Sequence, residues 1–406
     1  MLHHSSIDAP AVPPREGPPG ASAILCFSHL RWNFVYQRPQ HLLTRFAHVR
    51  PVYYVEEPLF DTPAPRLERV RDGSGVAVLT PHLPGGMPPE RIARELRAMI
   101  DGVIAADAVH RDVLWYYTPM PRRFTAHLRP LATVYDCMDE LSAFAGASLE
   151  LPHAERELLA AADLVFTGGH SLYEAKRTLH PNVHACPSSV DKAHFARARR
   201  ITADVPDQAP IPRPRLGFFG VLDERLDAPL LAAVAARRPD WQLVLVGPVV
   251  KIDPATLPQA PNIHYLGPRS YAVLPEYIAG WDAALLPLAR NEATRVISPT
   301  KTPEYLAAGR PVVSTSVRDV VRPYGDLGLA RIADAPDAFV AAVEAALADP
   351  APARLAAADA FLAQMSWDLT WARMARLLDE AVARRPAPAA ALQAARRAGS
   401  APATLR

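Results

Sequence analysis

Residues 201–215 read ITADVPDQAPIPRPR, a stretch with four prolines and almost no large apolar side chain. Proline lacks a backbone N–H and cannot continue a helix or a central strand, so this composition is typical of a linker or a long loop. On both sides of the stretch, short β-rich runs alternate with helical segments. We therefore expect two folded domains that are joined at residues 201–215.

Before this segment, runs rich in apolar and β-branched residues alternate with amphipathic stretches. We expect strands near 24–28, 52–56, 76–79, 113–117, 133–136 and 164–167, and helices near 38–48, 90–106, 151–162 and 171–179. Apolar runs of this length, separated by helices, are typical of a parallel sheet that is buried on both faces.

After the segment the same alternation starts again. We expect strands near 216–219, 243–246, 263–266, 283–287, 312–315 and 329–332, and helices near 227–238, 271–280, 302–309 and 335–348. Two such sets predict an α/β protein with two Rossmann-like, doubly wound domains that face each other across a cleft.

One more helix is expected from Trp367 to about Arg384. Its apolar residues, with helical spacing, are Trp367, Leu369, Trp371, Met374 and Leu377. We expect this helix to brace the two domains. The domain prediction is then a disordered tail at 1–20, an N-terminal domain at 21–200, a linker at 201–215, a C-terminal domain at 216–366, the bracing helix at 367–384 and a second disordered tail at 385–406.

The composition excludes several classes of protein. Of the 406 residues 50% are hydrophobic, and 44 Lys and Arg against 42 Asp and Glu leave a net charge of +2, which argues against nucleic acid as a partner. No membrane span and, from the opening residues, no secretory signal is expected. Three scattered cysteines (Cys26, Cys137 and Cys186) are too few for a disulfide framework or a zinc site, so a cytoplasmic location is the simplest.

The strongest candidate for a ligand site is residues 298–315, SPTKTPEYLAAGRPVVST. Ser298-Pro299 and Thr302-Pro303 both fit an N-cap followed by proline, which predicts a helix start, and Gly309 ends the helix. Backbone donors and the ammonium of Lys301 suit a diphosphate, and Glu304 suits a ribose diol. Taken singly, Lys301 fits a solvated lysine and Glu304 a simple partner of the helix dipole.

A second junction is residues 216–227, LGFFGVLDERLD. Gly220 would let the backbone approach a ligand, and Arg225 would reach a phosphate; a turn glycine followed by surface charge fits equally well. Gly267 ends another expected strand, and Tyr271 after it suits stacking on a base or ordinary packing. The fingerprints GxGxxG and GxxxxGK[ST] are absent, which argues against nicotinamide and P-loop enzymes.

In the N-terminal half, residues 28–41 form a polar and aromatic loop of the kind that grips a sugar. Residues 135–140, YDCMDE, bring carboxylates to a strand end. These acids fit a metal site, helix caps or contacts to sugar hydroxyls. Since no cluster of His and Cys accompanies them, we expect hydroxyl contacts and neither a metal site nor a cofactor.

Residues 298–315 resemble the donor signature of retaining GT-B glycosyltransferases, the broad glycosyltransferase family 4 group. Residues 31–43 (RWNFVYQRPQHLL) and 135–144 (YDCMDELSAF) resemble a bacterial branch related to teichuronic-acid and exopolysaccharide glycosyltransferases. Residues 262–267 and 281–287 also match the second domain of that group. The resemblance extends over about residues 22–384.

The resemblance implies a nucleoside diphosphate sugar in the second domain and an acceptor in the first. The residues assigned to the donor are Glu304 for the ribose, Lys301 and Arg225 for the diphosphate, and Gly220, Gly267, Tyr271, Ser298 and Thr300 around them. Asp136 would lie beside the reacting sugar. Many relatives carry two Glu separated by seven residues, and the first position is Val296 here. Its sugar contact would come from Asn291, Glu292 or Arg295.

The implied activity is that of a hexosyltransferase (EC 2.4 class), retaining and independent of metal, which builds a polysaccharide or glycolipid of the cell envelope. A lipid-linked acceptor would add a peripheral contact with the inner face of the cell membrane. Two other functions fit the same architecture: a nucleotide-sugar epimerase, and a non-catalytic binder of nucleotide sugars.

Overall fold

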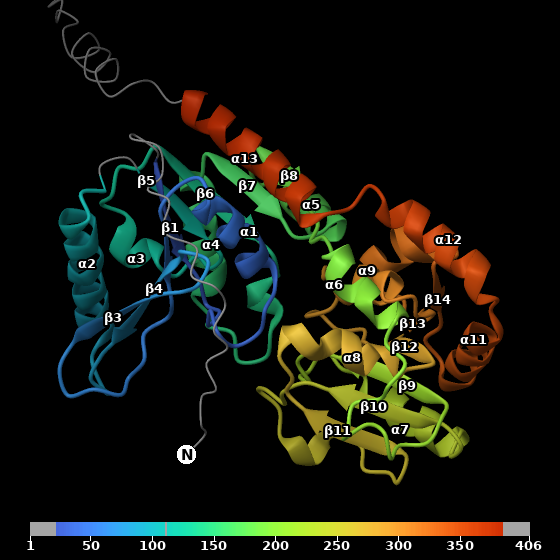
Figure 1. Ribbon diagram of the computed structural model, residues 1–406. Coiled ribbons are helices and arrows are strands. Elements are labelled where there is room, and N and C mark those ends of the chain that lie inside the picture. The colour runs from blue at the N-terminus through green and yellow to red at the C-terminus, as the bar shows by residue number, and fades with distance from the viewer. Residues whose placement is uncertain (1–21, 110–111, 385–406) are drawn as a thin grey trace, which may run out of the picture.

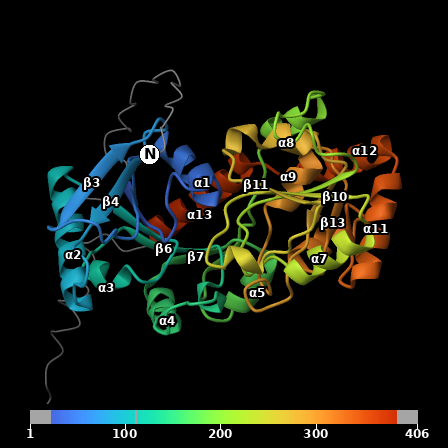
Figure 2. The same cartoon turned by 90° about the horizontal axis from the view of Figure 1, so that it is seen from below.

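The computed structural model describes residues 22–109 and 112–384. They form two α/β units side by side, each with helices packed on a central sheet (Figure 1). A view from below shows the same two units (Figure 2). The predicted fold class, two largely parallel α/β sheets, is confirmed. The tails expected at 1–20 and 385–406 lie outside the described residues.

The first unit contains an eight-stranded sheet in the order β3-β4-β2-β1-β5-β6-β7-β8. Its strands are β1 (Ala23–Phe27), β2 (Val52–Val55), β3 (Arg66–Arg71), β4 (Ala77–His82), β5 (Asp112–Tyr116), β6 (Ala132–Cys137), β7 (Leu164–Thr167) and β8 (Val183–Ala185). Its helices are α1 (Arg38–Ala47), α2 (Pro89–Ala106), α3 (Arg122–Thr125), α4 (Leu151–Ala161) and α5 (His170–Lys176). All pairs are parallel except β3 with β4. The strand order reverses between β1 and β5.

The second unit contains a six-stranded parallel sheet in the order β11-β10-β9-β12-β13-β14. Its strands are β9 (Arg215–Phe219), β10 (Gln242–Val246), β11 (Ile263–Gly267), β12 (Ala283–Leu286), β13 (Val312–Ser314) and β14 (Ala330–Ile332). Its helices are α7 (Ala228–Arg237), α8 (Leu274–Ala279), α9 (Lys301–Ala307), α10 (Arg318–Val320), α11 (Pro336–Ala348) and α12 (Ala351–Leu362), and α6 (Lys192–Ala196) precedes them. The order reverses between β9 and β12, where doubly wound sheets place ligands.

The last helix, α13 (Trp367–Arg384), follows the second unit in sequence but packs on the first. Figure 1 shows it in red above β7 and β8, beyond the turn that follows α12. Its buried residues Trp367, Met374 and Leu378 join the core cluster that contains β1, β5 and β6. The predicted stripe is wrong at Leu369, which is 57% exposed. The helix therefore ties the chain that leaves the second unit back to the first.

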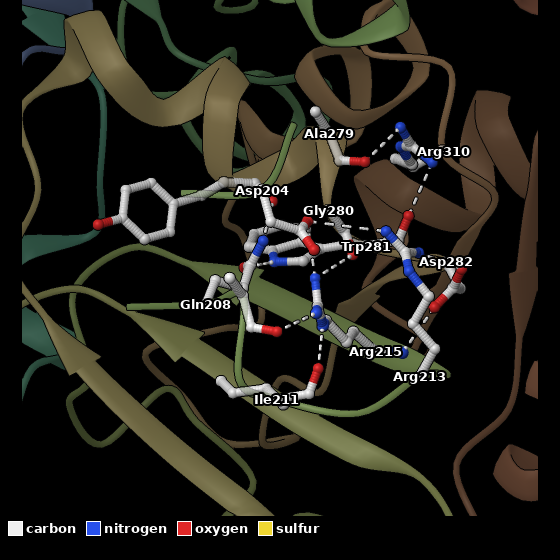
Figure 3. A network of polar contacts seen from close by, with 12 residues as sticks. Asp204, Gln208, Ile211, Arg213, Arg215, Ala279, Gly280, Trp281, Asp282 and Arg310 are labelled. Atoms are coloured by element: carbon white, nitrogen blue, oxygen red, sulfur yellow. Dashed lines mark hydrogen bonds and ion pairs between the residues drawn. The ribbon is translucent and has the colours of Figure 1, made fainter. Parts of the chain in front are cut away.

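The proline-rich segment before β9 is packed against the second unit (Figure 3). The side chain of Gln208 is fully buried, donates to the carbonyl of Tyr277 and accepts from the indole of Trp281. Arg215, the first residue of β9, forms a 2.8 Å ion pair with Asp204. The segment is a structured loop of the second unit. The domain boundaries expected from the sequence stay predictions.

Candidate functional site

The backbone after β9 passes directly under Lys301, at the point where the strand order of the second sheet reverses. Gly220 has a φ of +140°, and a Cβ atom there would lie 2.3 Å from Cε of Lys301. Gly247 is equally crowded, since a Cβ there would lie 1.8 Å from the carbonyl oxygen of Gly220. Glycine at both positions therefore allows the lysine to lie on the backbone.

Lys301 is the first residue of α9 and lies in a charged, half-buried environment. Its Nζ is 5.7 Å from the ring centre of Phe218 and 5.9 Å from that of Phe219. Burial and the nearby charge of Arg225 lower the pKa of Lys301, while acidic neighbours, Glu304 foremost, act in the opposite direction. The ammonium of Lys301 is therefore partly desolvated even when no ligand is bound.

Glu304 follows three residues later on α9 and is 7% exposed. In the described part of the chain, its Oε2 atom has no hydrogen-bond partner. Burial raises the pKa of Glu304 to about 8, and the charge of Lys301 acts against this rise. A buried carboxyl oxygen without a protein partner is suited to receive the hydroxyl of a ligand.

Arg225 approaches the first unit and is already paired within its own unit. Its Nε and Nη2 donate to the two carboxylate oxygens of Asp223 at 2.9 and 2.6 Å. Its guanidinium also lies 5.4 Å from the ring centre of Phe144, which belongs to the first unit. The arginine therefore brings a cation to the cleft together with a fixed counter-charge.

Asp136, which the sequence placed beside the reacting sugar, is fully buried in the first unit. Both of its oxygens accept hydrogen bonds from Arg38, whose side chain is 1% exposed, at 2.8 to 3.1 Å. The geometry corrects the expectation: Asp136 is half of an internal ion pair and does not line the cleft. The residue alternation of β6 points it into the core.

Asp139, beyond the end of the same strand, is half-buried. Burial raises the pKa of Asp139 to about 6, while the charges of Arg225 and Lys301 in the second unit lower it. The carboxylate that the first unit offers to the cleft is therefore Asp139. The sequence motif YDCMDE contained it, but the motif alone did not distinguish the two acids.

His29 lies within residues 28–41, the loop expected to bind a sugar, but is not itself among the predicted site residues, and neither is Lys251. His29 follows β1, and its Nδ1 atom is buried without a partner among the described residues. Burial and the charge of Lys251 lower the pKa of His29 to about 4. Lys251 also lies 5.7 Å from the ring centre of Phe144. The only available signal was the place of His29 directly after the first strand.

Tyr271 lies within electrostatic reach of Glu304, and burial, followed by the charge of Glu304, raises the pKa of Tyr271. Its hydroxyl is buried without a partner in the described chain. Its ring stacks on His194 and Tyr36, with centres 4.2 and 4.8 Å away, which favours packing over base stacking. Gly267 ends β11 at the edge of the sheet with a φ of +72°, and a Cβ atom there would lie 3.9 Å from Nη1 of Arg269.

The residues before α9 form the boundary between the two units. The helix begins at Lys301, with Thr300 as its N-cap, and contains seven residues. Ser298 lies against Gly169 of the first unit. Val296 is 5% exposed and belongs to a core cluster of the first unit. An apolar side chain thus fills the place of the family's first Glu.

The three residues proposed to replace that Glu have other partners. Asn291 donates to the carbonyl of Glu224, and Glu292 and Arg295 form an exposed ion pair.

Over residues 22–109 and 112–384, no three His, Cys, Asp or Glu side chains are grouped so as to hold a metal ion. Over the same residues, no helix has the length and hydropathy to cross a membrane.

Comparison with known proteins gives relatives in sequence and in structure. Residues 213–349 match the family model described as glycosyl transferases group 1. TuaH of Bacillus subtilis (strain 168), whose assigned role is that of a teichuronic acid biosynthesis glycosyltransferase, is 26% identical over 253 residues. That match covers 57% of this chain and 63% of the Bacillus protein, so just under two thirds of the relative's length is aligned.

Solved structures with the same fold cover nearly the whole chain. Sucrose-phosphate synthase from Thermosynechococcus elongatus aligns with a TM-score of 0.67 at 16% identity, over 90% of this chain and 100% of that one. A structure described as trehalose-6-phosphate from E. coli, bound with UDP-2-fluoro glucose, aligns with a TM-score of 0.64 at 12% identity, again over 90% and 100%. Residues 213–349 are thus similar to the glycosyl transferases of group 1, the chain is distantly similar to TuaH in sequence, and its fold is the GT-B fold of these solved structures.

Proposed function

We propose that this protein transfers a sugar from a nucleoside diphosphate sugar to a hydroxyl group of an acceptor. The region that matches the group 1 model, residues 213–349, contains Gly220, Arg225, Lys301 and Glu304. The structural relative from E. coli is bound with UDP-2-fluoro glucose, which supports a nucleotide sugar as the donor. The observation that carries the proposal is the ammonium of Lys301, held on the Gly220 backbone at the switch point of the sheet.

The donor half of the site would stabilise a departing diphosphate. When the bond between the sugar and the phosphate breaks, negative charge grows on the leaving oxygen. Lys301 and Arg225 are already fixed around that position, so they need little reorganisation to stabilise the charge. Glu304 would bind the ribose diol through its unpartnered oxygen.

The acceptor half of the site belongs to the first unit. Asp139 lies within electrostatic reach of Arg225 and Lys301, and His29 within that of Lys251. A carboxylate at position 139 would accept a hydrogen bond from the attacking hydroxyl. We propose a retaining hexosyl transfer in which the chain's own cations, without a metal, balance the leaving group. The relation to TuaH supports a glycan or lipid-linked acceptor of the cell envelope, handled in the cytoplasm or at the inner face of the membrane.

The first experiment measures donor binding in the wild type and in Lys301→Ala. Melting temperature is recorded with UDP, GDP, ADP, CDP and dTDP, because a ligand that binds the folded state raises it. We expect one nucleotide to stabilise the wild type, and Lys301→Ala to lose that stabilisation while it still folds. With the matching sugar donor, turnover should fall roughly 100- to 1,000-fold.

Lys192→Ala, a half-exposed lysine on α6, is the matched control and should behave as the wild type. Full turnover in Lys301→Ala would refute the role of Lys301. A transferase releases nucleotide only when an acceptor is present. Conversion of the sugar without an acceptor would instead identify an epimerase, and binding without turnover a non-catalytic binder.

A further inference from the structure

The two units touch where α5 begins, at Gly169. A Cβ atom on Gly169 would lie 2.4 Å from Oδ2 of Asp319 and 2.5 Å from Cβ of Ser298. Both of those atoms belong to the second unit. Any larger residue at position 169 would therefore collide across the boundary between the units, and only glycine permits this approach.

Asp319 uses this approach to bind the first unit directly. Its Oδ2 accepts from the backbone N–H of His170 at 2.8 Å, and its Oδ1 accepts from that of Ser171 at 3.0 Å. The side chain is 5% exposed, so water competes little for these bonds. Hydrogen bonds to a carboxylate are about twice as strong as neutral ones. Both oxygens of a buried charge on one unit are thus bound to the backbone of the other.

The segment that Asp319 binds is fixed to the loop that carries Asp139. Gly168 lies against Met138, whose carbonyl oxygen would be 2.9 Å from a Cβ at that position. At the other end of α5, the buried Lys176 forms ion pairs of 2.7 Å with Glu140 and 2.8 Å with Glu155. Met138 and Glu140 are the neighbours of Asp139 in sequence. A shift of α5 would therefore move the Asp139 loop with it.

We propose that Asp319 is a positioning residue, which holds α5, and through it the Asp139 loop, at a fixed place opposite Arg225 and Lys301. The proposal rests on the proposed function, because it names what sets the distance between the acceptor half and the donor half of that site. Asp319 touches neither substrate. It sets the relative position of the two units. A shift of about 1 Å between reacting groups is enough to lower a rate about 100-fold.

The first test compares Asp319→Asn with Asp326→Asn in the full chain. Asp326 lies on the same segment, is exposed and pairs only with Arg322 four residues earlier. We expect Asp319→Asn to lower kcat 10- to 100-fold while the dissociation constant of the stabilising nucleotide stays within twofold of the wild type. Asp326→Asn should leave both unchanged. An unchanged kcat in Asp319→Asn would overturn the proposal.

The second test needs no ligand and so does not depend on the proposed function. The three cysteines of the chain are buried, so spin labels can be attached at Leu149→Cys in the first unit and Leu327→Cys in the second, both exposed positions. We expect a narrow distribution of label distances in the wild type and a longer or broader one in Asp319→Asn. Gly169→Ala, which adds only a methyl group at the boundary, should have the same effect.

The outcomes separate the two proposals. If no nucleotide binds but both substitutions change the label distances, the interdomain contact stands and the glycosyltransferase proposal fails. If nucleotides bind and turn over but the label distances are those of the wild type in both variants, Asp319 does not position the units. Should Asp319→Asn fail to fold, Gly169→Ala decides the question alone.

Discussion

Asp136 and Asp139 are separated by two residues and occupy opposite environments. Asp136 lies within β6, where the side chain points to the core and binds Arg38; that arginine also donates to the carbonyl of Cys186. Asp139 lies beyond the end of the strand, where the chain enters the cleft. A carboxylate in the first environment stabilises the fold, and one in the second is available to a substrate.

We expect Asp136→Asn and Asp139→Asn to separate these two roles. Loss of the Asp136 charge leaves the guanidinium of Arg38 buried without its counter-ion, which costs roughly 3 kcal/mol of the free energy of unfolding. Asp139→Asn should change that free energy by less than about 1 kcal/mol and lower kcat/KM about 100-fold. Urea unfolding and steady-state kinetics measure the two effects.

The pH dependence of kcat/KM tests whether the ionised carboxylate of Asp139 is the group that acts in the reaction. Because the pKa of Asp139 is raised to about 6, the wild type gains the ionised carboxylate as pH rises through 6, and kcat/KM should rise with it. Asp139→Asn should lack this rising limb. A variant that keeps the limb would show that another group titrates there, and would remove Asp139 from the acceptor half of the site.

The residues proposed for the donor half of the site are marked by local sequence signals, whereas those proposed for the acceptor half depend on the tertiary fold. Gly220 ends a buried strand and Lys301 starts a proline-marked helix, and both features can be read within a few residues of sequence. Asp136 lies within β6 and Asp139 beyond its end, and the sequence does not mark the residue at which the strand ends. The charge that acts on His29 belongs to Lys251, about 220 residues away in sequence, and no local pattern links the two.

At the scale of elements, the buried strands were predicted well because each is a short apolar run. The edge strand β3 (Arg66–Arg71, RLERVR) was missed because five of its six residues are exposed and four are charged. The helix α12 was missed because its alanine-rich sequence has almost no amphipathic pattern. The composition of the proline-rich segment before β9 predicts a linker or a long loop, but it does not predict the buried polar contacts that hold this segment to the second unit.

Those contacts make a prediction about that segment. Gln208→Ala removes the partner of the buried Trp281 indole and of the Tyr277 carbonyl (Figure 3). We expect it to lower the free energy of unfolding of the second unit by about 2 kcal/mol, since two buried polar groups lose their partners. Gln259→Ala, at an exposed position in the same unit, should change it little. Equal stabilities would mean that the segment does not support the unit. Urea unfolding, followed by tryptophan fluorescence, measures both.

At the scale of the whole molecule, the last helix in sequence, α13, belongs to the hydrophobic core of the first unit and not to that of the second unit, which it follows. Residues that follow the second unit complete the first, because α13 covers the strands β6 and β7. The sequence predicted the helix and its bracing role from the apolar spacing. It did not show which unit the helix covers, since the same stripe would fit either sheet.

This arrangement predicts which of the two units loses stability when a core residue of α13 is replaced. Met374 is fully buried against the first unit, so Met374→Ala should leave a cavity there and cost about 2 to 4 kcal/mol. Hydrogen exchange should therefore quicken in β6 and β7, which lie more than 200 residues away in sequence, and stay unchanged in β9 and β12, which are nearer to Met374 along the chain. Leu369→Ala, on the exposed side of the same helix, should alter neither sheet. Faster exchange in the second sheet would show that α13 stabilises the unit it follows, and the return of the chain to the first unit would then contribute little to its core.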